Sequence, residues 1–272
     1  MKSSAAQLLF LIVFLFLSNI RAQQLVSGDS CNTTASCDTK AECAGSEYCD
    51  EDCKQVENII AKGHIDSIEG WAIRHNSLAK LFASRQCKVV AEIGVAYATL
   101  TNYLLTKLPS ITEYHGIDPF LGGYDENDAM SKTLLGYKPR TFANAVLEKL
   151  KTFECKFHMH FGLSGDVAKT FKNESIDCLF IDGDHTYHGV VEDIKNWLPL
   201  VRKGGSIIFD DYSHSYQGLV LAVDQFVDNN NLQFIKVNEH NNYYVALHSG
   251  PYAYNTSFEK FFDYGNSNDK NI

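Results

Sequence analysis

The chain alternates short apolar runs with segments in which apolar residues recur at helical spacing. The pattern is clearest between residues 176 and 212, where the apolar run IDCLFI is followed by a mixed segment and then by the run SIIF. The apolar residues of the mixed segment stand at steps of three and four: Val190, Val191, Ile194, Trp197, Leu198 and Val201. This spacing predicts an amphipathic helix that Gly204 and Gly205 would end, so the stretch is predicted to be a strand–helix–strand unit.

The same alternation predicts the elements in the rest of the chain. Predicted strands cover residues 87–95, 113–117 and 155–162, and predicted helices cover 52–62, 67–85, 100–108, 141–152, 164–171 and 219–227. The later runs LQFIKV and YYVALH, joined by an asparagine-rich turn, predict a β-hairpin. Residues 120–140 are polar, contain glycine and show no clear period, so we expect a long lid or substrate loop there.

Acidic residues gather where the two strands of the 176–212 unit end. Asp182 follows the first strand, with His185 just beyond it, and Asp210 and Asp211 follow the second. Parallel strands joined by a right-handed crossover end at the same edge of a sheet, so these side chains should lie together. Crowded carboxylates repel one another unless a cation offsets their charge, and oxygen ligands suit Mg²⁺, Mn²⁺ or Ca²⁺. The sequence therefore predicts a divalent-cation site, although Asp182, Asp210 and Asp211 could each cap a helix and His185 could be an ordinary turn histidine.

Two earlier strand ends carry candidate residues for binding a nucleotide-like ligand. The run CKVVAEIGV passes through Gly94 into a helix, where backbone N–H groups can approach a ligand. Only one of the usual three glycines is present, so an ordinary strand-to-helix turn is an equal alternative. Asp118 ends the next strand, 26 positions after Glu92, near the place where a carboxylate accepts ribose hydrogen bonds in doubly wound folds. Helix capping is the alternative role for Asp118.

His158 and His160 stand on one face of the predicted strand 155–162. Two histidines at this spacing could bind a metal ion. Nothing else nearby in the sequence supplies ligands, so a structural role is expected for the pair.

The first 22 residues have the features of a secretory signal peptide. Lys2 precedes an apolar run from Leu8 to Leu17, and small or polar residues follow up to Ala22. A run of ten residues is shorter than the roughly 20 that a spanning helix needs, so cleavage after Ala22 and no membrane span in the mature protein are expected. The predicted location is secreted or lumenal in the secretory pathway, with a signal anchor in the endoplasmic reticulum or Golgi as the alternative.

The cysteines agree with an oxidising compartment. Five of the eight lie between residues 31 and 53, within a segment (23–62) that has few large apolar residues, so disulfides are expected to hold it. Because five is odd, one of them pairs with Cys87, Cys155 or Cys178, or a thiol stays free. Zinc binding by the segment is disfavoured, since the block of cysteines has no C-x-x-C pair and no histidine.

The net charge limits the partners of the chain. It has 24 basic and 33 acidic residues and a formal charge of -9, and loss of Lys2 and Arg21 with the signal peptide leaves 22 against 33, or -11. Such an acidic surface disfavours nucleic acids and anionic membranes as partners. Three N-x-S/T triplets fit a secreted glycoprotein: Asn32, Asn173 and Asn255.

The order of these elements resembles the class I S-adenosylmethionine-dependent methyltransferases. The run VVAEIGVAYATL resembles the first cofactor motif of that family, with alanines at 96 and 98 where glycines are typical, and the turn FGLSGD resembles its adenine-contacting turn. The resemblance covers about Lys88 to Leu247. It implies an α/β fold with a doubly wound, mostly parallel seven-stranded sheet and a terminal antiparallel hairpin, the Rossmann-like methyltransferase fold. The implied cofactor-binding residues are Glu92, Gly94, Asp118, Ser164 and Asp182.

Within this class, the acidic residues resemble those of the metal-dependent O-methyltransferases. The catechol and caffeoyl-CoA types carry an Asp after strand four and an Asp-Asn pair after strand five, matched here by Asp182, Asp210 and Asp211, the last in the Asn position. The DGDH turn resembles the macrolide sugar O-methyltransferases, in which a histidine three residues after the metal-binding aspartate acts as base. The resemblance thus implies a divalent cation, Mg²⁺ first, and His185 as the catalytic base, with Tyr212 and His214 as nearby substitutes.

The sequence as a whole predicts an S-adenosylmethionine-dependent O-methyltransferase of the secretory pathway, assisted by a divalent metal and acting on a hydroxyl of a sugar or small molecule. The predicted divisions are 1–22 (signal peptide), 23–62 (cysteine-rich segment), 63–248 (methyltransferase domain) and 249–272 (tail). The main alternative is a secreted, non-catalytic binding protein that keeps the fold, favoured by the two alanines and by the cytosolic origin of the methyl donor. An NAD-dependent dehydrogenase is disfavoured because no G-x-G-x-x-G follows the first strand. No oligomeric state is predicted.

Overall fold

A computed structural model of the chain describes residues 55, 56, 58, 68–124, 128–230, 232, 234–239 and 242–248. The predicted signal peptide, nearly all of the cysteine-rich segment with the helix predicted over 52–62, and the tail lie outside the described residues. Within the described part, no helix combines the length and apolar character needed to cross a membrane.

Strands and helices alternate along the chain, as the apolar pattern predicts. The strands are β1 (Val89–Ile93), β2 (Glu113–Asp118), β3 (Phe157–Phe161), β4 (Ile176–Ile181), β5 (Val201–Phe209), β6 (Phe234–Glu239) and β7 (Asn242–His248). The helices are α3 (Ile68–Ser84), α4 (Thr99–Lys107), α5 (Ala129–Leu134), α6 (Pro139–Lys149), α7 (Ser164–Ala168), α8 (Tyr187–Trp197) and α9 (Gln217–Asn230). Two 3-10 turns, η2 (Lys151–Phe153) and η3 (Leu198–Leu200), follow α6 and α8.

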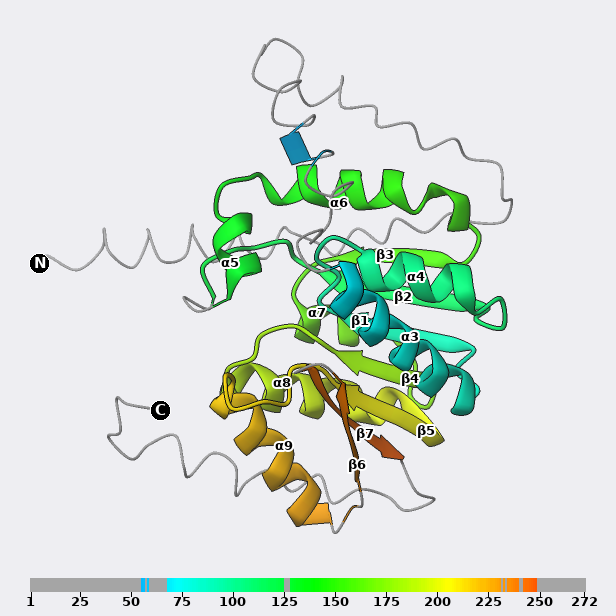
Figure 1. Ribbon diagram of the computed structural model, residues 1–272, viewed down its shortest axis with the longest axis vertical. Helices are drawn as coiled ribbons and strands as arrows, with labels where there is room; N and C mark the ends of the chain where they lie inside the picture. The colour runs from blue at the N-terminus through cyan, green and yellow to red at the C-terminus, as the bar shows by residue number, and fades with distance from the viewer. Residues whose placement is uncertain are drawn as a thin grey trace, which may run out of the picture.

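The strands form one sheet in the order β3-β2-β1-β4-β5-β7-β6 (Figure 1). Strands β1 to β5 are parallel, which confirms the predicted α/β class with its parallel sheet. Strand β7 pairs antiparallel with β5, and β6 with β7. The chain first runs outward from β1 to β3 and then returns to continue on the other side of β1 with β4. This reversal of strand order between β1 and β4 is where open α/β sheets bind ligands.

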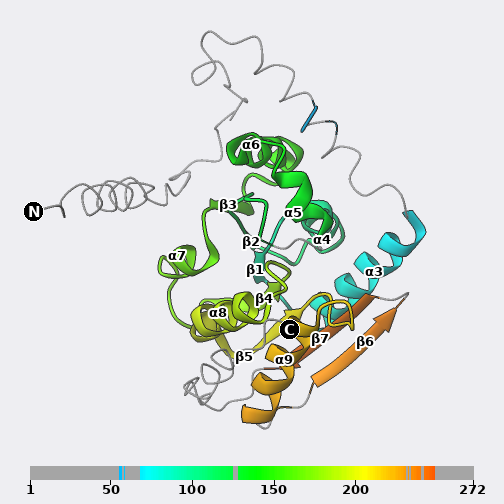
Figure 2. The ribbon, with the colours of Figure 1, turned by 90° about the vertical axis from the view of Figure 1, so that its left-hand side faces the viewer.

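Both faces of the sheet are covered by helices (Figure 2). Val90 and Phe180 belong to one buried cluster with residues of α3, α4 and α6. Their neighbours Ala91 and Leu179 belong to a second cluster with residues of α8 and α9. Successive side chains of a strand point to opposite faces, so a strand buried on both sides must be apolar throughout. This explains why β1 and β4 appear in the sequence as continuous apolar runs.

The prediction of a loop over residues 120–140 is wrong in part. The segment contains α5 and the start of α6. Asp128 caps α5, since its side chain accepts a hydrogen bond from the backbone N–H of Met130 at 2.7 Å, and Pro139 occupies the first turn of α6. A six-residue helix set by its cap is too short to produce an apolar period, and so the sequence pattern did not show it.

The prediction that the helix between β4 and β5 extends to Val201 is also wrong. Helix α8 ends at Trp197 and Val201 begins β5. Pro199 lies in the short turn between them, where its missing N–H cannot continue the helical hydrogen bonds. Gly204, with φ of 76°, lies inside β5 at an irregularity in its pairing with β4 and does not end the helix.

A disulfide links the neighbouring strands β1 and β4. Cys87, just before β1, bonds to Cys178 in β4, with a Cα–Cα distance of 5.5 Å. Cys155 is also disulfide-bonded, and its partner lies outside the described residues. The odd cysteine count left two alternatives, a disulfide between the cysteine-rich segment and the main domain or a free thiol. The first alternative requires a bond of this kind, from a cysteine of the main domain to a residue outside the described part.

Candidate functional site

A cleft of about 1050 Å³ lies at the carboxyl ends of the central strands. It is placed at the switch between β1 and β4, because the loops that follow these strands diverge to opposite faces. Every site residue predicted from the sequence lines this cleft except Asp210: Glu92, Gly94, Asp118, Ser164, Asp182, His185 and Asp211.

The turn from β1 into α4 depends on residues with positive φ. Gly94 has φ of 87°, and a Cβ at this position would lie 1.9 Å from the backbone oxygen of Asp182. Glycine is therefore required where β1 and β4 come together. Ala96 and Ala98 adopt φ of 48° and 53°, the left-handed conformation that glycine usually supplies, at a cost of roughly 1–2 kcal/mol each. The two alanines thus keep the backbone form of the glycines that they replace.

Asp118 organises the same turn from the end of β2. Its carboxylate accepts hydrogen bonds from the backbone N–H groups of Val95 and Ala96, both at 2.9 Å, and of Phe120 at 2.6 Å. Burial raises the pKa of Asp118, and these backbone hydrogen bonds oppose the rise without cancelling it. A carboxylate has about four acceptor positions, so one remains for a ligand hydroxyl.

Glu92 lies deeper, in the wall of the cleft. It accepts hydrogen bonds from the hydroxyls of Thr101, at 2.5 Å, and Tyr114, at 2.9 Å. Burial raises the pKa of Glu92 to about 8, although both hydrogen bonds favour its charged form. A largely protonated, hydrogen-bonded Glu92 supports the wall of the cleft next to the turn.

Ser164 connects the cleft to α8. Its hydroxyl donates to the Asp193 carboxylate at 2.5 Å and accepts from the indole N–H of Trp197 at 2.7 Å. Burial raises the pKa of Asp193 to about 7. Asp193 is not among the residues predicted from the sequence, yet the signal is present, because this carboxylate stands three residues after Val190 on the otherwise apolar face of the helix. The contact of Ser164 with an adenine ring stays a prediction.

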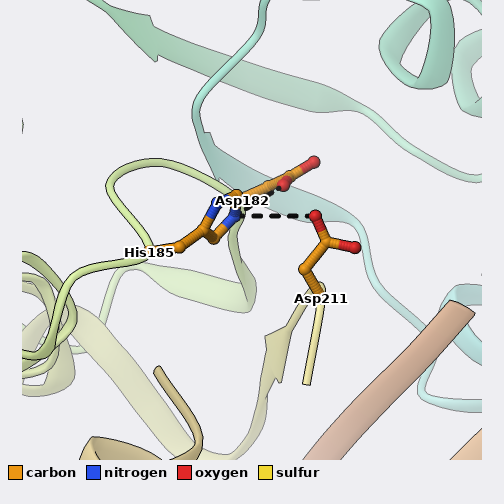
Figure 3. Close-up of side chains that lie close together, drawn as sticks. All are labelled: Asp182, His185 and Asp211. Carbon is orange, nitrogen blue, oxygen red and sulfur yellow. Dashed lines mark ion pairs between the residues drawn. The ribbon is translucent and has the colours of Figure 1, made fainter. Parts of the chain in front are cut away.

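Three polar side chains that line the cleft lie close together (Figure 3). His185 Nε2 lies 3.5 Å from Asp182 Oδ1 and 3.8 Å from Asp211 Oδ2. One ligand atom from each of the three lies within 4.8 Å of the others. The His185 ring is 8% exposed and packs against Tyr216, with ring centroids 4.4 Å apart. The strand ends of β4 and β5 therefore bring these residues together, as the parallel-strand argument predicts.

The charges of this group influence one another. Burial lowers the pKa of His185, but the contact with Asp182 and the charge of Asp211 outweigh this effect, so the pKa is raised overall. Burial and the Asp182 charge raise the pKa of Asp211, against the attraction of His185 and Arg74. Both ring nitrogens of His185 are buried and have no hydrogen-bond partner among the described residues. Two carboxylates beside an unbonded imidazole are donors that fit a divalent cation.

Asp210 does not join this group, although the sequence predicted it as a metal ligand. It is fully buried and forms an ion pair with Arg74 of α3, whose guanidinium also lies 3.4 Å from Asp182 Oδ2. Both residues lie just past the end of β5, where Asp211 has φ of 51° and the chain leaves the extended conformation. Asp211 contacts His185 there, whereas Asp210 contacts Arg74. Arg74 was missed because its contact with Asp182 spans 108 positions in sequence and no local pattern marks it.

The two suggested substitutes for the catalytic base are placed elsewhere. The hydroxyl of Tyr212 donates to the Asp224 carboxylate at 2.5 Å. His214 is exposed and does not line the cleft. Of the three bases suggested from the sequence, His185 is therefore the one that lines the cleft.

The parallel sheet with its cleft at the switch point defines a Rossmann-like α/β domain of the nucleotide-cofactor type. Residues 91–212 match a family model described as a methyltransferase domain, and the site residues from Glu92 to Asp211 fall within the match. This part of the chain is therefore similar to methyltransferase domains.

Comparisons with whole proteins agree on the fold. The chain resembles the O-methyltransferase from Bacillus cereus solved in complex with SAH, at 16% identity and a TM-score of 0.51, covering 77% of this chain and 95% of that one. It also resembles the O-methyltransferase TomG from Streptomyces achromogenes in complex with SAM, at 18% identity and a TM-score of 0.50, covering 72% and 90%.

One curated relative is an uncharacterised protein of Acanthamoeba polyphaga mimivirus. It is 36% identical over 92 residues, which is 30% of this chain and 41% of the relative. The matched part is therefore less than half of either protein.

Proposed function

We propose that this protein is an S-adenosylmethionine-dependent O-methyltransferase. The observation that carries the proposal is the position of His185 between Asp182 and Asp211 in the same cleft as the Gly94 turn. A cofactor turn and a proton acceptor in one cleft are what transfer of a methyl group to a hydroxyl needs.

The chain's own residues suit the cofactor. The backbone from Gly94 to Ala98 and the N-terminus of α4 would face it, and Asp118 keeps an acceptor position for a ribose hydroxyl. Leu163, Ser164 and Gly165 line the part of the cleft where the adenine is expected. S-adenosylmethionine, when bound, supplies an electrophilic methyl group on sulfur.

Asp182 and Asp211 would hold a divalent cation, with Mg²⁺ as the first candidate. Such a cation lowers the pKa of an acceptor hydroxyl and orients it. His185 would take the hydroxyl proton on Nε2, and the two neighbouring carboxylates would stabilise the resulting imidazolium. Asp210 would pair with Arg74 and so hold the Arg74 guanidinium beside Asp182.

The acceptor that we propose is a hydroxyl of a sugar or another small molecule, met in the secretory pathway. The signal-peptide pattern at residues 1–22, the buried Cys87–Cys178 disulfide and the exposed sequon residue Asn173 support this compartment. The protein would be secreted or lumenal, with a signal anchor in the endoplasmic reticulum or Golgi as the alternative.

Calorimetric titration of the glycosylated, signal-free protein with S-adenosylmethionine, with and without Mg²⁺, tests the proposal. We expect binding with a dissociation constant in the micromolar range, roughly -8 kcal/mol. Binding would justify a screen of glycan and small-molecule hydroxyls. Absence of binding under both conditions would favour the alternative, a non-catalytic secreted binding protein with this fold.

Replacing His185 with alanine should reduce kcat by a factor of roughly 10² to 10⁴ while leaving cofactor affinity unchanged. His188→Ala is the matched control, because that histidine is exposed and does not line the cleft. If His185 binds the metal and does not act as base, the Mg²⁺ concentration for half-maximal activity should rise as well. A loss of less than about tenfold in kcat would assign proton removal to another group.

A further inference from the structure

A second group of metal-binding side chains lies on the sheet, away from the cleft. His115 in β2 stands directly opposite His158 in β3, and His160 lies two residues further along β3 on the same face. From the sequence, a structural role is expected for His158 and His160, because no further ligand stands nearby. The structure supplies two, His115 and Glu113, from a segment more than 40 positions earlier in the chain.

The four side chains are in contact. Glu113 Oε1 lies 3.0 Å from His115 Nε2 and 4.0 Å from His158 Nε2. On its other side, His115 Nδ1 lies 3.0 Å from His160 Nε2. The rings of His115 and His158 are stacked, with centroids 5.2 Å apart. His115 and His158 thus both approach the same oxygen of Glu113, and His160 contacts the other ring nitrogen of His115.

The two ring nitrogens of His115 have different partners, His160 on one side and Glu113 on the other. A hydrogen bond between His115 Nδ1 and His160 leaves His115 Nε2 to face Glu113. This is the arrangement by which an outer partner orients a metal-binding histidine.

The group borders a separate cavity of about 190 Å³ near the amino ends of β1 and β2, lined in part by Glu113, His115 and His160. Helix α7, which follows β3, is only five residues long, and the aromatic ring that packs on His115 and His160 is that of Phe171. Other strand residues on this face, such as Ile93 and Ile117, are apolar and buried. His115 and His160 line this cavity, and His158 stands beside His115 on the neighbouring strand.

We propose that Glu113, His115 and His158 bind a zinc ion, with His160 orienting His115. Two histidines and one carboxylate are a set of ligands that zinc takes, with a water molecule completing the tetrahedron. Zinc–ligand bonds of about 2.0–2.1 Å place neighbouring ligand atoms about 3.3 Å apart, close to the 3.0 and 4.0 Å found around Glu113 Oε1.

Binding requires a movement of His158, because the ligand atoms of Glu113, His115 and His158 do not all lie within 4.8 Å of one another. The His158 side chain is 33% exposed and the Glu113 side chain 46%, so both can turn toward the ion without disturbing the core. The bound ion would link the edge strand β3 to β2 and stabilise the fold.

Titration of the full, signal-free chain with ZnCl₂ after treatment with a chelator tests the site. The parent protein for this titration is the His185→Ala variant, because loss of His185 weakens the cleft as a competing zinc site. In this background we expect one zinc ion to bind, and His158→Ala and Glu113→Gln each to lower zinc affinity by at least roughly tenfold, as even loss of an outer partner does. His188→Ala, which removes an exposed histidine, is the matched control and should leave affinity unchanged.

Two further readouts separate zinc binding from damage to the fold. Without metal, the His158 and Glu113 variants should unfold at the same temperature as their parent, because both side chains are partly exposed. With zinc, the Tm of the parent should rise by about 2–4 °C or more and that of the variants should not. Co²⁺ in place of zinc should give the visible absorption of a tetrahedral site. Equal zinc affinity in the parent and in both variants would overturn the proposal.

Discussion

Replacing Asp182 with alanine should lower turnover by roughly 10³-fold or more and remove the response to Mg²⁺. Asp182 contacts both His185, at 3.5 Å, and Arg74, at 3.4 Å. The substitution removes a candidate metal ligand together with the carboxylate that stabilises a protonated His185. A cation that contributes several kcal/mol to the transition state accounts for a loss of this size.

The measurement is kcat at saturating cofactor and acceptor across a range of Mg²⁺ concentrations, with a chelator as the zero point. Asp166→Ala is the matched control, because this aspartate is exposed and pairs with Lys169 outside the cleft. Its turnover should equal that of the wild type. Wild-type rates in the presence of the chelator would remove the metal from the mechanism, and a fully active Asp182→Ala variant would remove Asp182 from the site.

The Asp182 variant should still bind S-adenosylmethionine, though more weakly. The backbone of the Gly94 turn and Asp118 are untouched by the substitution, and Asp182 is bonded to β1 through its backbone N–H, which donates to Ile93 O at 2.8 Å. Binding with lost turnover would separate the acceptor side of the cleft from the cofactor side.

Replacing Gly94 with alanine should destabilise the domain by about 3 kcal/mol or more and weaken cofactor binding at least tenfold. The new Cβ would lie 1.9 Å from the Asp182 backbone oxygen and 2.6 Å from its carbonyl carbon. Both are backbone atoms, which cannot rotate away as a side chain does. The positive φ of 87° adds strain for any residue with a side chain.

Thermal unfolding and calorimetric titration with S-adenosylmethionine measure the two effects. A loss of about 3 kcal/mol corresponds to a fall in Tm of roughly 6–12 °C for a domain of this size. Gly136→Ala is the matched control, because a Cβ there has Thr133 O as its nearest neighbour at 3.5 Å, an ordinary contact. An unchanged Tm and affinity in the Gly94 variant would show that β1 and β4 do not meet as described.

Most of the parallel sheet could be predicted from the sequence because its strands are buried on both faces. Continuous apolar runs such as those of β1 and β4 follow directly from that burial. Helix α5 and the start of β5 could not be predicted, since a single cap at Asp128 and the missing N–H of Pro199 set them. A single capping residue or a single proline leaves no periodic pattern of apolar residues in the sequence.

The sequence determined that Asp182, His185 and Asp211 would meet, because parallel strands end at one edge of the sheet. Tertiary structure alone decided that Asp211 faces the cleft while Asp210 turns to Arg74, and that Glu113 and His115 join the histidines of β3. Those outcomes depend on the turn of the chain after β5, where Asp211 has φ of 51°, and on contacts between segments far apart in sequence. Residue types and local spacing specify which elements form, whereas the packing of distant elements selects the partners of each charged side chain.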